Sequence, residues 1–328
     1  MVMQSIAALI VSFFMTVAAG YILIPALRRM KAGQSIREDG PIWHNTKEGT
    51  PTMGGIMFIV GIAVSCLTVG FKEIKGGEFE KIFIFLFALI FAAIGFLDDL
   101  EKLKKKQNLG LKASHKFVLQ VIVAVLFVTL MRMTGKLTPV LYIPFINANL
   151  NLPLPLYYIF AAFVSVGTVN SVNITDGADG LATGVSIPVA ICITAVSILW
   201  KDGALGIFAA ALTGGLIAFL IFNFYPAKVF MGDTGAQFLG GTICAFAFAL
   251  DMPLILLPLG IIYCLETLSD IIQVVYYKLT HGKRFFKMAP LHHHLELCGW
   301  SEKKLFAVFT AVSAAFAVLS FFGVWKRY

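Results

Sequence analysis

The chain has 328 residues, which is long enough for two soluble domains, but its composition excludes that architecture. Apolar residues make up 59% of the sequence and charged residues 13%, whereas soluble domains average about 45–50% and about 25%. The mean hydropathy is +0.85, so the sequence predicts an integral membrane protein. A disordered chain and a disulfide scaffold are excluded as well, because polar residues are scarce and only 5 residues are cysteine.

A membrane-spanning helix needs about 20 mostly apolar residues, and ten segments of the chain meet this requirement. They predict an all-α polytopic fold with ten transmembrane helices in a single domain, residues 1–328. The first segment is too long for the apolar part of a signal peptide, so we expect it to be retained. The segments cover residues 4–27, 53–71, 82–97, 117–134, 156–174, 180–200, 203–222, 235–251, 253–277 and 305–325.

The distribution of basic residues predicts the orientation, because Lys and Arg are enriched in cytoplasmic loops. With ten spans, 18 of the 26 Lys and Arg residues fall on one side, which places both termini outside the cytoplasm. The segment 117–134 is the weakest, since it carries Gln120 and Arg132, but removing it scatters the polar motifs over both faces. In the outer loop 137–155, short β-favouring runs around Asn147 and Asn149 are compatible with a small hairpin.

The same topology gathers the unusual polar sequence, including all six histidines, on the cytoplasmic face, and this convergence predicts a functional site. The polar segments are HNTKEGTPTMGG (44–55), DDLEK (98–102), NSVNITDGADGLA (170–182), NFYPAKVFMGDTG (223–235) and MAPLHHHLE (288–296).

Two of these segments place carboxylates beside helix ends. Asp98 and Asp99 close the third apolar segment, with Lys102 one turn further on, and adjacent carboxylates suit a divalent metal or a base beside a phosphate. Asp233 lies between two glycines before the eighth segment, where backbone N–H groups attract anions. Taken alone, each pattern is equally typical of a polar or capped helix end. No Walker A lysine motif is present, which excludes a P-loop.

The segment 170–182 places Asn173, Asp176 and Asp179 at three-residue intervals. On a continuous helix they would share one face, whereas Gly177 and Gly180 permit a break. The spacing lacks the alternate oxygen ligands and the final Glu of an EF-hand. Taken alone, such a cluster is usually a turn.

The histidines 292–294 follow Pro290 and cannot all point in one direction on a helix, which argues against a His₃ zinc site made by them alone. As donors they suit anionic oxygens, and a fortuitous loop tract is the alternative. Glu266, Asp270 and Gln273 form a polar stripe on the ninth segment. Acidic residues at membrane depth mark a functional path or a structural polar pair.

Together the five polar segments, in this order and topology, resemble the phospho-N-acetylmuramoyl-pentapeptide transferase (MraY) family of the polyprenyl-phosphate N-acetylhexosamine-1-phosphate transferase superfamily. The resemblance runs from about Gly33 to Trp300. It implies ten helices, a cytoplasmic active-site cleft, a broken ninth helix and a homodimer. It also implies that undecaprenyl phosphate attacks UDP-MurNAc-pentapeptide, giving lipid I and UMP with Mg²⁺, at the bacterial cytoplasmic (inner) membrane. No nucleic-acid partner is expected.

The resemblance also assigns site residues. The implied catalytic residues are Asp98, Asp99, Asp233, His292, His293 and His294, with Asp233 as the Mg²⁺ ligand. The implied substrate-binding residues are Lys47, Thr52, Lys102, Lys116, Asn170, Asn173, Asp176, Asp179, Asn223, Phe230 and Gln273.

Two alternatives stay open on the sequence. A UDP-GlcNAc:polyprenyl-phosphate transferase would share most of the motifs, although PLHHHLE and GTPTMGG favour the muramoyl-pentapeptide branch. A secondary transporter would use Glu266 and Asp270 as a relay, but the first five segments show no inverted repeat in the last five, and the loop motifs would be idle.

Overall fold

The computed structural model describes residues 1–30, 47, 49–71, 80–105, 107, 110–135, 137–325 and 327. Residues 44–46 and 48 of the first polar segment lie outside this part of the chain. The helices that precede the hairpin are α1 (Val2–Arg29), α2 (Gly55–Thr68), α4 (Glu80–Lys105) and α5 (Ala113–Met133). The hairpin comprises β1 (Val140–Ile143) and β2 (Ala148–Asn151). The later helices are α6 (Leu154–Thr175), α7 (Leu181–Leu199), α8 (Gly203–Asn223), α9 (Gly232–Ala249), η2 (Pro253–Ile255), α10 (Leu256–Leu259), α11 (Ile261–Leu279), α12 (Leu291–Glu296) and α13 (Glu302–Trp325).

The structure confirms a multi-pass, mostly helical membrane protein. Among the described residues, seven helices (α1, α4 to α8 and α13) are long and apolar enough to span a membrane. The bent pair formed by residues 253–259 and α11 raises that number to eight if it is one span. Helix α2 has only 14 residues, or about 21 Å against a hydrocarbon core of about 30 Å. The count of ten spans and the side on which the termini lie therefore stay predictions.

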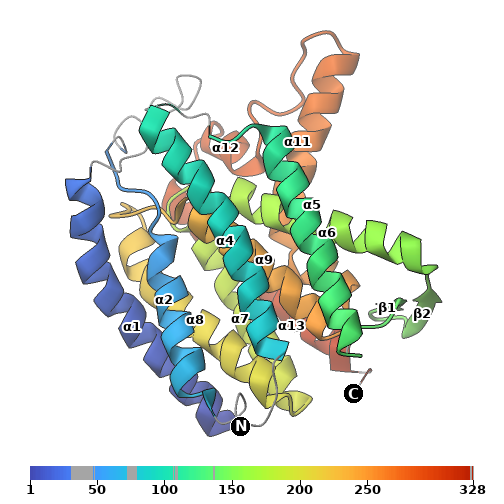
Figure 1. Cartoon of the computed structure of the whole chain (residues 1–328). Helices are drawn as coiled ribbons and strands as arrows, with labels where there is room; N and C mark the ends of the chain where they lie inside the picture. Colours follow the sequence, from blue (N-terminus) through green and yellow to red (C-terminus); the bar gives the residue numbers. More distant parts are fainter. Residues whose placement is uncertain are drawn as a thin grey trace.

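The predicted hairpin is confirmed. Strands β1 and β2 pair antiparallel, with Val140 opposite Asn151 and Ile143 opposite Ala148. The hairpin and both chain termini lie toward one end of the helix bundle, and α12 lies at the other end (Figure 1). This separation agrees with the sequence prediction that the termini and the polar motifs lie at opposite ends.

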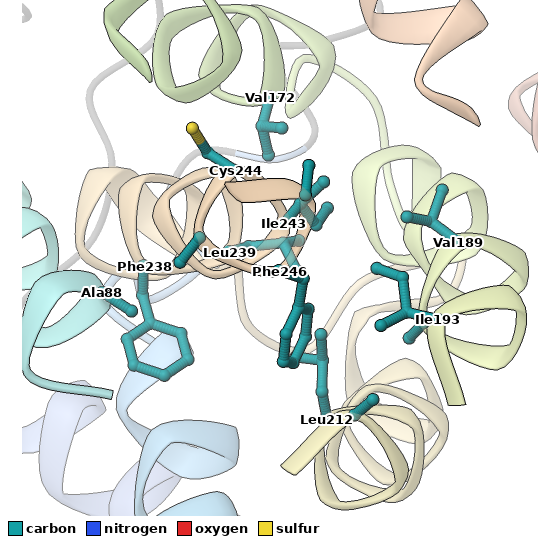
Figure 2. Packing of buried hydrophobic residues seen from close by; sticks show 14 of the residues in the cluster. Ala88, Val172, Val189, Ile193, Leu212, Phe238, Leu239, Ile243, Cys244 and Phe246 are labelled. Carbon is teal, nitrogen blue, oxygen red and sulfur yellow. The ribbon is translucent and has the colours of Figure 1, made fainter. Parts of the chain in front are cut away.

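Helix α9 runs through the centre of the bundle. Leu239, Ile243 and Phe246 of α9 lie among buried side chains from α4, α6, α7 and α8 (Figure 2). Glycines allow α4 and α6 to come close to α9, since a side chain at Gly95 would collide with the Asp233 backbone. Small residues at helix contacts are typical of membrane bundles. The start of α9, which carries Asp233, is therefore held between neighbouring helices.

Two segment boundaries differ from the prediction. Helix α4 does not end at residue 97 but continues to Lys105, so Asp98 and Asp99 lie inside a helix. The ninth segment, which is continuous by hydropathy, is broken at Gly260, where the two parts meet at 83°. This break agrees with the broken ninth helix that the family resemblance implies. Hydropathy alone cannot reveal either feature, because the charged residues among 98–105 end the apolar run without ending the helix, and a bend leaves hydropathy unchanged.

Candidate functional site

Asp233, in the first turn of α9, joins side chains from three other helices. Its Oδ2 accepts hydrogen bonds from Lys116 Nζ of α5 at 2.8 Å and from Lys102 Nζ of α4 at 3.1 Å. Its Oδ1 accepts a hydrogen bond from Asn173 Nδ2 of α6 at 2.8 Å. The positive end of the helix dipole also favours an acidic residue at this position. The fold thus brings four of the predicted site residues into direct contact.

Asp98 shares the lysines of Asp233. Its Oδ2 lies 2.7 Å from Lys102 Nζ and 3.9 Å from Lys116 Nζ, and its Oδ1 accepts a hydrogen bond from the Leu111 backbone N–H at 2.9 Å. The side chain is only 4% exposed. Two carboxylates and two ammonium groups therefore form a compact charged cluster, defined here by Asp98, Lys102, Lys116 and Asp233. Buried charges persist only when paired in this way.

Asp99 has a different environment from its neighbour. Adjacent side chains on a helix diverge by about 100°, and Asp99 points to the start of α9. Its Oδ1 accepts the Asp233 N–H at 3.1 Å, and its Oδ2 accepts the Thr234 N–H at 2.9 Å and the Thr234 hydroxyl at 2.7 Å. Both carboxylate oxygens are thus used to cap α9, whose first N–H groups have no partner within the helix. These contacts indicate that Asp99 positions the start of α9. The family resemblance, in contrast, implies that Asp99 is a catalytic residue.

Asp176 and Asp179 lie in the turn between α6 and α7 and not on a continued helix. Helix α6 ends at Thr175, and Gly180 has a φ of +71°, which favours glycine. Burial, followed by the negative charges of Asp233, Asp99 and Asp179, raises the pKa of Asp176 well above its usual value. Among the described residues, no hydrogen bond to the Asp176 carboxylate accompanies this burial.

Asp179 belongs to a separate ion-pair network. Lys47 Nζ lies 2.7 Å from Asp179 Oδ1 and 2.7 Å from Glu302 Oε2. Glu302 Oε2 also accepts the Asp179 N–H at 2.9 Å, and Asp179 Oδ2 accepts the Ala227 N–H at 2.8 Å. Burial opposes the charged form of Lys47, but the two carboxylates raise its pKa above the usual value. No sequence pattern indicated a role for Glu302, a single acidic residue at the start of the last helix.

Asn223 supports the loop that precedes α9. Its Oδ1 accepts a hydrogen bond from the Thr183 hydroxyl at 2.8 Å, and its Nδ2 donates to the Val229 carbonyl at 3.1 Å. The side chain is 1% exposed. Both ends of this amide are therefore engaged in holding the loop to α7.

Phe230 connects that loop to the GTPTMGG segment through its backbone. Its N–H donates to the Pro51 carbonyl at 2.9 Å, and its carbonyl accepts the Gly54 N–H at 2.8 Å. A side chain added at Gly232 would meet the Thr52 hydroxyl at 2.6 Å. Thr52 thus lies beside the start of α9, next to the charged cluster.

The three histidines point to different partners, as the sequence predicted. The buried His292 ring contacts Glu266 through Nδ1 at 2.8 Å, and its backbone N–H donates to the same carboxylate at 3.2 Å. Its Nε2 has no partner among the described residues and lies against Gly177, where any Cβ would overlap the imidazole. His292 therefore packs against the turn that carries Asp176.

His293 and His294 are used locally. His293 Nδ1 lies 2.8 Å from Glu296 Oε2 on the same short helix. His294 Nδ1 accepts the Lys287 N–H at 3.1 Å. The structure therefore does not bring either ring into contact with the charged cluster.

Gln273 holds the segment after α11. Its Oε1 accepts the Phe285 and Phe286 N–H groups at 3.1 and 2.9 Å, and its Nε2 donates to the Phe286 carbonyl at 3.3 Å. Asn170 is also engaged away from the cluster, since its Nδ2 donates to Gln120 Oε1 at 2.9 Å. Gln273 therefore holds the segment after α11, and Asn170 joins α6 to α5. Among the described residues, no hydrogen bond joins either amide to the four residues of the charged cluster.

The charged cluster has the donor chemistry of a magnesium site that is completed by substrate. Among the described residues, no group of three or more His, Cys, Asp or Glu side chains is arranged to hold a metal. Mg²⁺, however, commonly uses one or two protein carboxylates and takes its other oxygens from phosphate and water. Asp98 and Asp233 provide such a pair, so these residues fit the ion.

Comparison with known proteins identifies the family. The family described as glycosyl transferase family 4 matches residues 81–251, and signature 1 of phospho-N-acetylmuramoyl-pentapeptide-transferase matches residues 47–59. A phospho-N-acetylmuramoyl-pentapeptide-transferase from Clostridium perfringens strain SM101 is 44% identical over 324 residues, covering 96% of this chain and 95% of its own. One from Carboxydothermus hydrogenoformans is 43% identical over 328 residues, covering 98% and 99%. This chain therefore belongs to the phospho-N-acetylmuramoyl-pentapeptide-transferase family.

Proposed function

We propose that this chain transfers phospho-MurNAc-pentapeptide from UDP-MurNAc-pentapeptide to undecaprenyl phosphate. An oxygen of the lipid phosphate forms a bond to the β-phosphorus of the nucleotide sugar. The bond between that phosphorus and the bridging oxygen breaks, and UMP leaves with the electron pair. The product is lipid I, a diphosphate-linked lipid, at the first membrane step of peptidoglycan synthesis.

The charged cluster is the observation that carries this proposal. Phosphoryl transfer requires positioning and charge neutralisation more than covalent work by the protein. Lys102 and Lys116 converge at 3.1 and 2.8 Å on Asp233, so two cations from two helices are available where phosphates would bind. An incoming phosphate could accept hydrogen bonds from these ammonium groups.

Magnesium is part of the proposal. Asp233 and Asp98 would hold Mg²⁺, which supplies neutralisation of the diphosphate charge when bound. Asn173 keeps the Asp233 carboxylate oriented through its 2.8 Å hydrogen bond. Asp99 fixes the start of α9 and so the position of Asp233. In this assignment Asp98 acts on the lipid phosphate through the ion and through the two cluster lysines, which it contacts. Near pH 7 that phosphate is largely dianionic, because the second pKa of a phosphate monoester is about 6.

The turn 176–180 would form the nucleotide side of the site. Asp176 lies at the start of this turn, and the Lys47, Asp179 and Glu302 network fixes its end. A carboxyl with a raised pKa keeps a proton to higher pH than usual. It can then donate a hydrogen bond to a base carbonyl or a ribose oxygen. Thr52, Asn223 and Phe230 would shape this side through the loop that they support.

The membrane setting follows the charge distribution. We place the protein in the bacterial cytoplasmic (inner) membrane with ten spans, both termini outside and the site facing the cytoplasm, because basic residues are concentrated on that side. Each basic residue near an anionic membrane surface adds roughly 1 kcal/mol of attraction, which favours a phosphorylated lipid substrate. A homodimer is proposed on the family resemblance alone.

Release of UMP from purified protein tests the function. With undecaprenyl phosphate present, we expect UMP from UDP-MurNAc-pentapeptide and much less from UDP-GlcNAc. Lys116→Met should abolish release, while Lys104→Met, which removes an exposed lysine from the same cytoplasmic region, should leave it unchanged. Faster release from UDP-GlcNAc would support the related GlcNAc-1-phosphate transferase. Substrate uptake by proteoliposomes without UMP release would support a transporter.

Cysteine labelling tests the orientation. A cysteine at Asn149, in β2, should react with an impermeant thiol reagent from outside the cell. A cysteine at Lys105, at the end of α4, should react only after the membrane is opened. Reversed labelling would place the charged cluster outside the cytoplasm and contradict the proposed location.

A further inference from the structure

A second polar layer lies one helical turn away from the charged cluster. It consists of three amide side chains, Gln120, Asn170 and Gln237, which we call the amide layer. Gln120 Nε2 donates to Gln237 Oε1 at 3.2 Å, and Asn170 Nδ2 donates to Gln120 Oε1 at 2.9 Å. Gln120 is 1% exposed and Gln237 0%.

The amide layer repeats the connectivity of the cluster. On α5, Gln120 follows Lys116 by four residues. On α9, Gln237 follows Asp233 by four residues, and on α6, Asn170 precedes Asn173 by three. Residues three or four apart lie on the same face of a helix. The same three helices are therefore joined twice, first through Asp233 and then through the amides.

Stability does not account for these amides. Hydrogen bonds between membrane helices add little, because the separated helices find other partners in the lipid-embedded chain. Gln237 Nε2 has no partner within the described residues, and such a buried donor lowers stability. Apolar side chains of similar volume would pack here without that penalty. A specific polar pairing adds a constraint to the packing of the helices, because any other rotation would leave the buried amides without their partners.

We infer that the amide layer is a positioning device for the transfer reaction. It fixes the rotation and height of α5, α6 and α9, so that Lys116, Asn173 and Asp233 meet in one geometry. Gln120, Asn170 and Gln237 touch no reacting group in this arrangement and act through those residues. Neutral amides suit the role, since a carboxylate at position 120 or 237 would compete with Asp233 for Lys116. The inference rests on the proposed function.

The test compares the variants Gln237→Met and Gln120→Met with their double variant. Methionine keeps the length and volume of glutamine and removes the hydrogen bonds. Thr242→Val is the matched control on α9, because the buried Thr242 hydroxyl donates only to the Phe238 carbonyl of its own helix at 2.8 Å. For each purified protein, kcat and KM for both substrates are measured by UMP release, together with the unfolding midpoint in detergent.

We expect each Met variant to lower kcat by about 10- to 100-fold, the range that follows from a misplacement of about 1 Å. Both KM values should stay within about twofold, because the cluster residues that bind phosphate are retained. The double variant should lose no more than the worse single variant, since one pairing has been removed in each. The unfolding midpoint of the double variant should equal that of Thr242→Val, because removing both partners leaves neither glutamine unpaired and Asn170 Nδ2 keeps the Val166 carbonyl.

The inference would be overturned if the single Met variants had the same kcat as Thr242→Val, or if their KM rose while kcat stayed unchanged. It would also be overturned if their loss of activity followed a loss of folded protein. A double variant whose kcat loss is the product of the two single losses would contradict it as well. An inactive wild-type protein would refute the proposed function, and the inference with it. An active wild type with unaffected Met variants would refute the amide layer alone.

Discussion

Asp98 and Asp99 are neighbours in the chain, but we expect substitutions at the two positions to have different effects on stability and activity. Asp99 accepts three hydrogen bonds from the start of α9, whereas Asp98 accepts one backbone hydrogen bond and pairs with lysines. We expect Asp99→Ala to reduce both folding stability and activity. We expect Asp98→Ala to reduce activity with little effect on stability.

The magnitude follows from the donors left without an acceptor. Asp99→Ala removes the acceptor of two N–H groups and one hydroxyl. The loss is about 2 kcal/mol if each bond contributes the roughly 0.6 kcal/mol typical of membrane helices. It rises toward about 5 kcal/mol if the buried donors find no water. Asp98→Ala frees one N–H and should cost about 1 kcal/mol or less, because Lys102 and Lys116 keep Asp233 as a partner.

The assay is unfolding in mixed detergent followed by circular dichroism, with UMP release measured per folded molecule. Asp99→Asn is an intermediate variant that keeps one carbonyl oxygen and should lose less stability than Asp99→Ala. Equal losses of stability for Asp98→Ala and Asp99→Ala, or a larger loss for Asp98→Ala, would refute the capping assignment.

Three further predictions concern the cluster and the turn. Asp233→Ala should abolish Mg²⁺-dependent turnover while the protein still folds, and normal Mg²⁺-dependent activity would contradict the metal assignment. For Asp98→Asn, the rate relative to wild type should stay flat from pH 6 to 9 if Asp98 positions the lipid phosphate, whereas a ratio that climbs about tenfold per pH unit below the phosphate pKa would indicate a base. Gly177→Ala should displace His292 and weaken nucleotide binding at a packing cost of about 1–3 kcal/mol, measured by calorimetry. Gly167→Ala is its control, because a Cβ there meets nothing within 4 Å, and equal binding by both variants would contradict the packing of His292 on the turn.

The sequence determined the membrane class, the mostly helical fold, the hairpin and the family. These properties depend on composition, on the length of apolar runs and on motifs whose residues are close in the chain. The motifs also named Asp98, Lys102, Lys116, Asn173 and Asp233 as site residues, and the fold brings all five together. Here local sequence and tertiary structure agree because each residue lies at the same end of the helix bundle, on or beside a predictable helix.

Only the tertiary structure shows that residues with similar positions in the sequence have different partners. Asp98 and Asp99 are adjacent in the chain, but one faces two lysines and the other faces the start of α9. Asn173 contacts Asp233, while Asn223 and Gln273 hold loops. The partners of these side chains lie on other helices, and the direction in which each helix is turned depends on packing between helices. The sequence pattern therefore does not predict how each helix is rotated.

The same reason explains what the sequence missed. Glu302 meets Lys47 across 255 residues of chain, and Gln120 meets Gln237 across 117. Glu302 lies just before the last apolar segment, and Gln120 and Gln237 lie within apolar segments, so the role of each depends on the residue opposite it. The sequence determined which chemistry is present and on which helices it is carried. The tertiary structure decided which groups meet, because that depends on how the helices are rotated and shifted against one another.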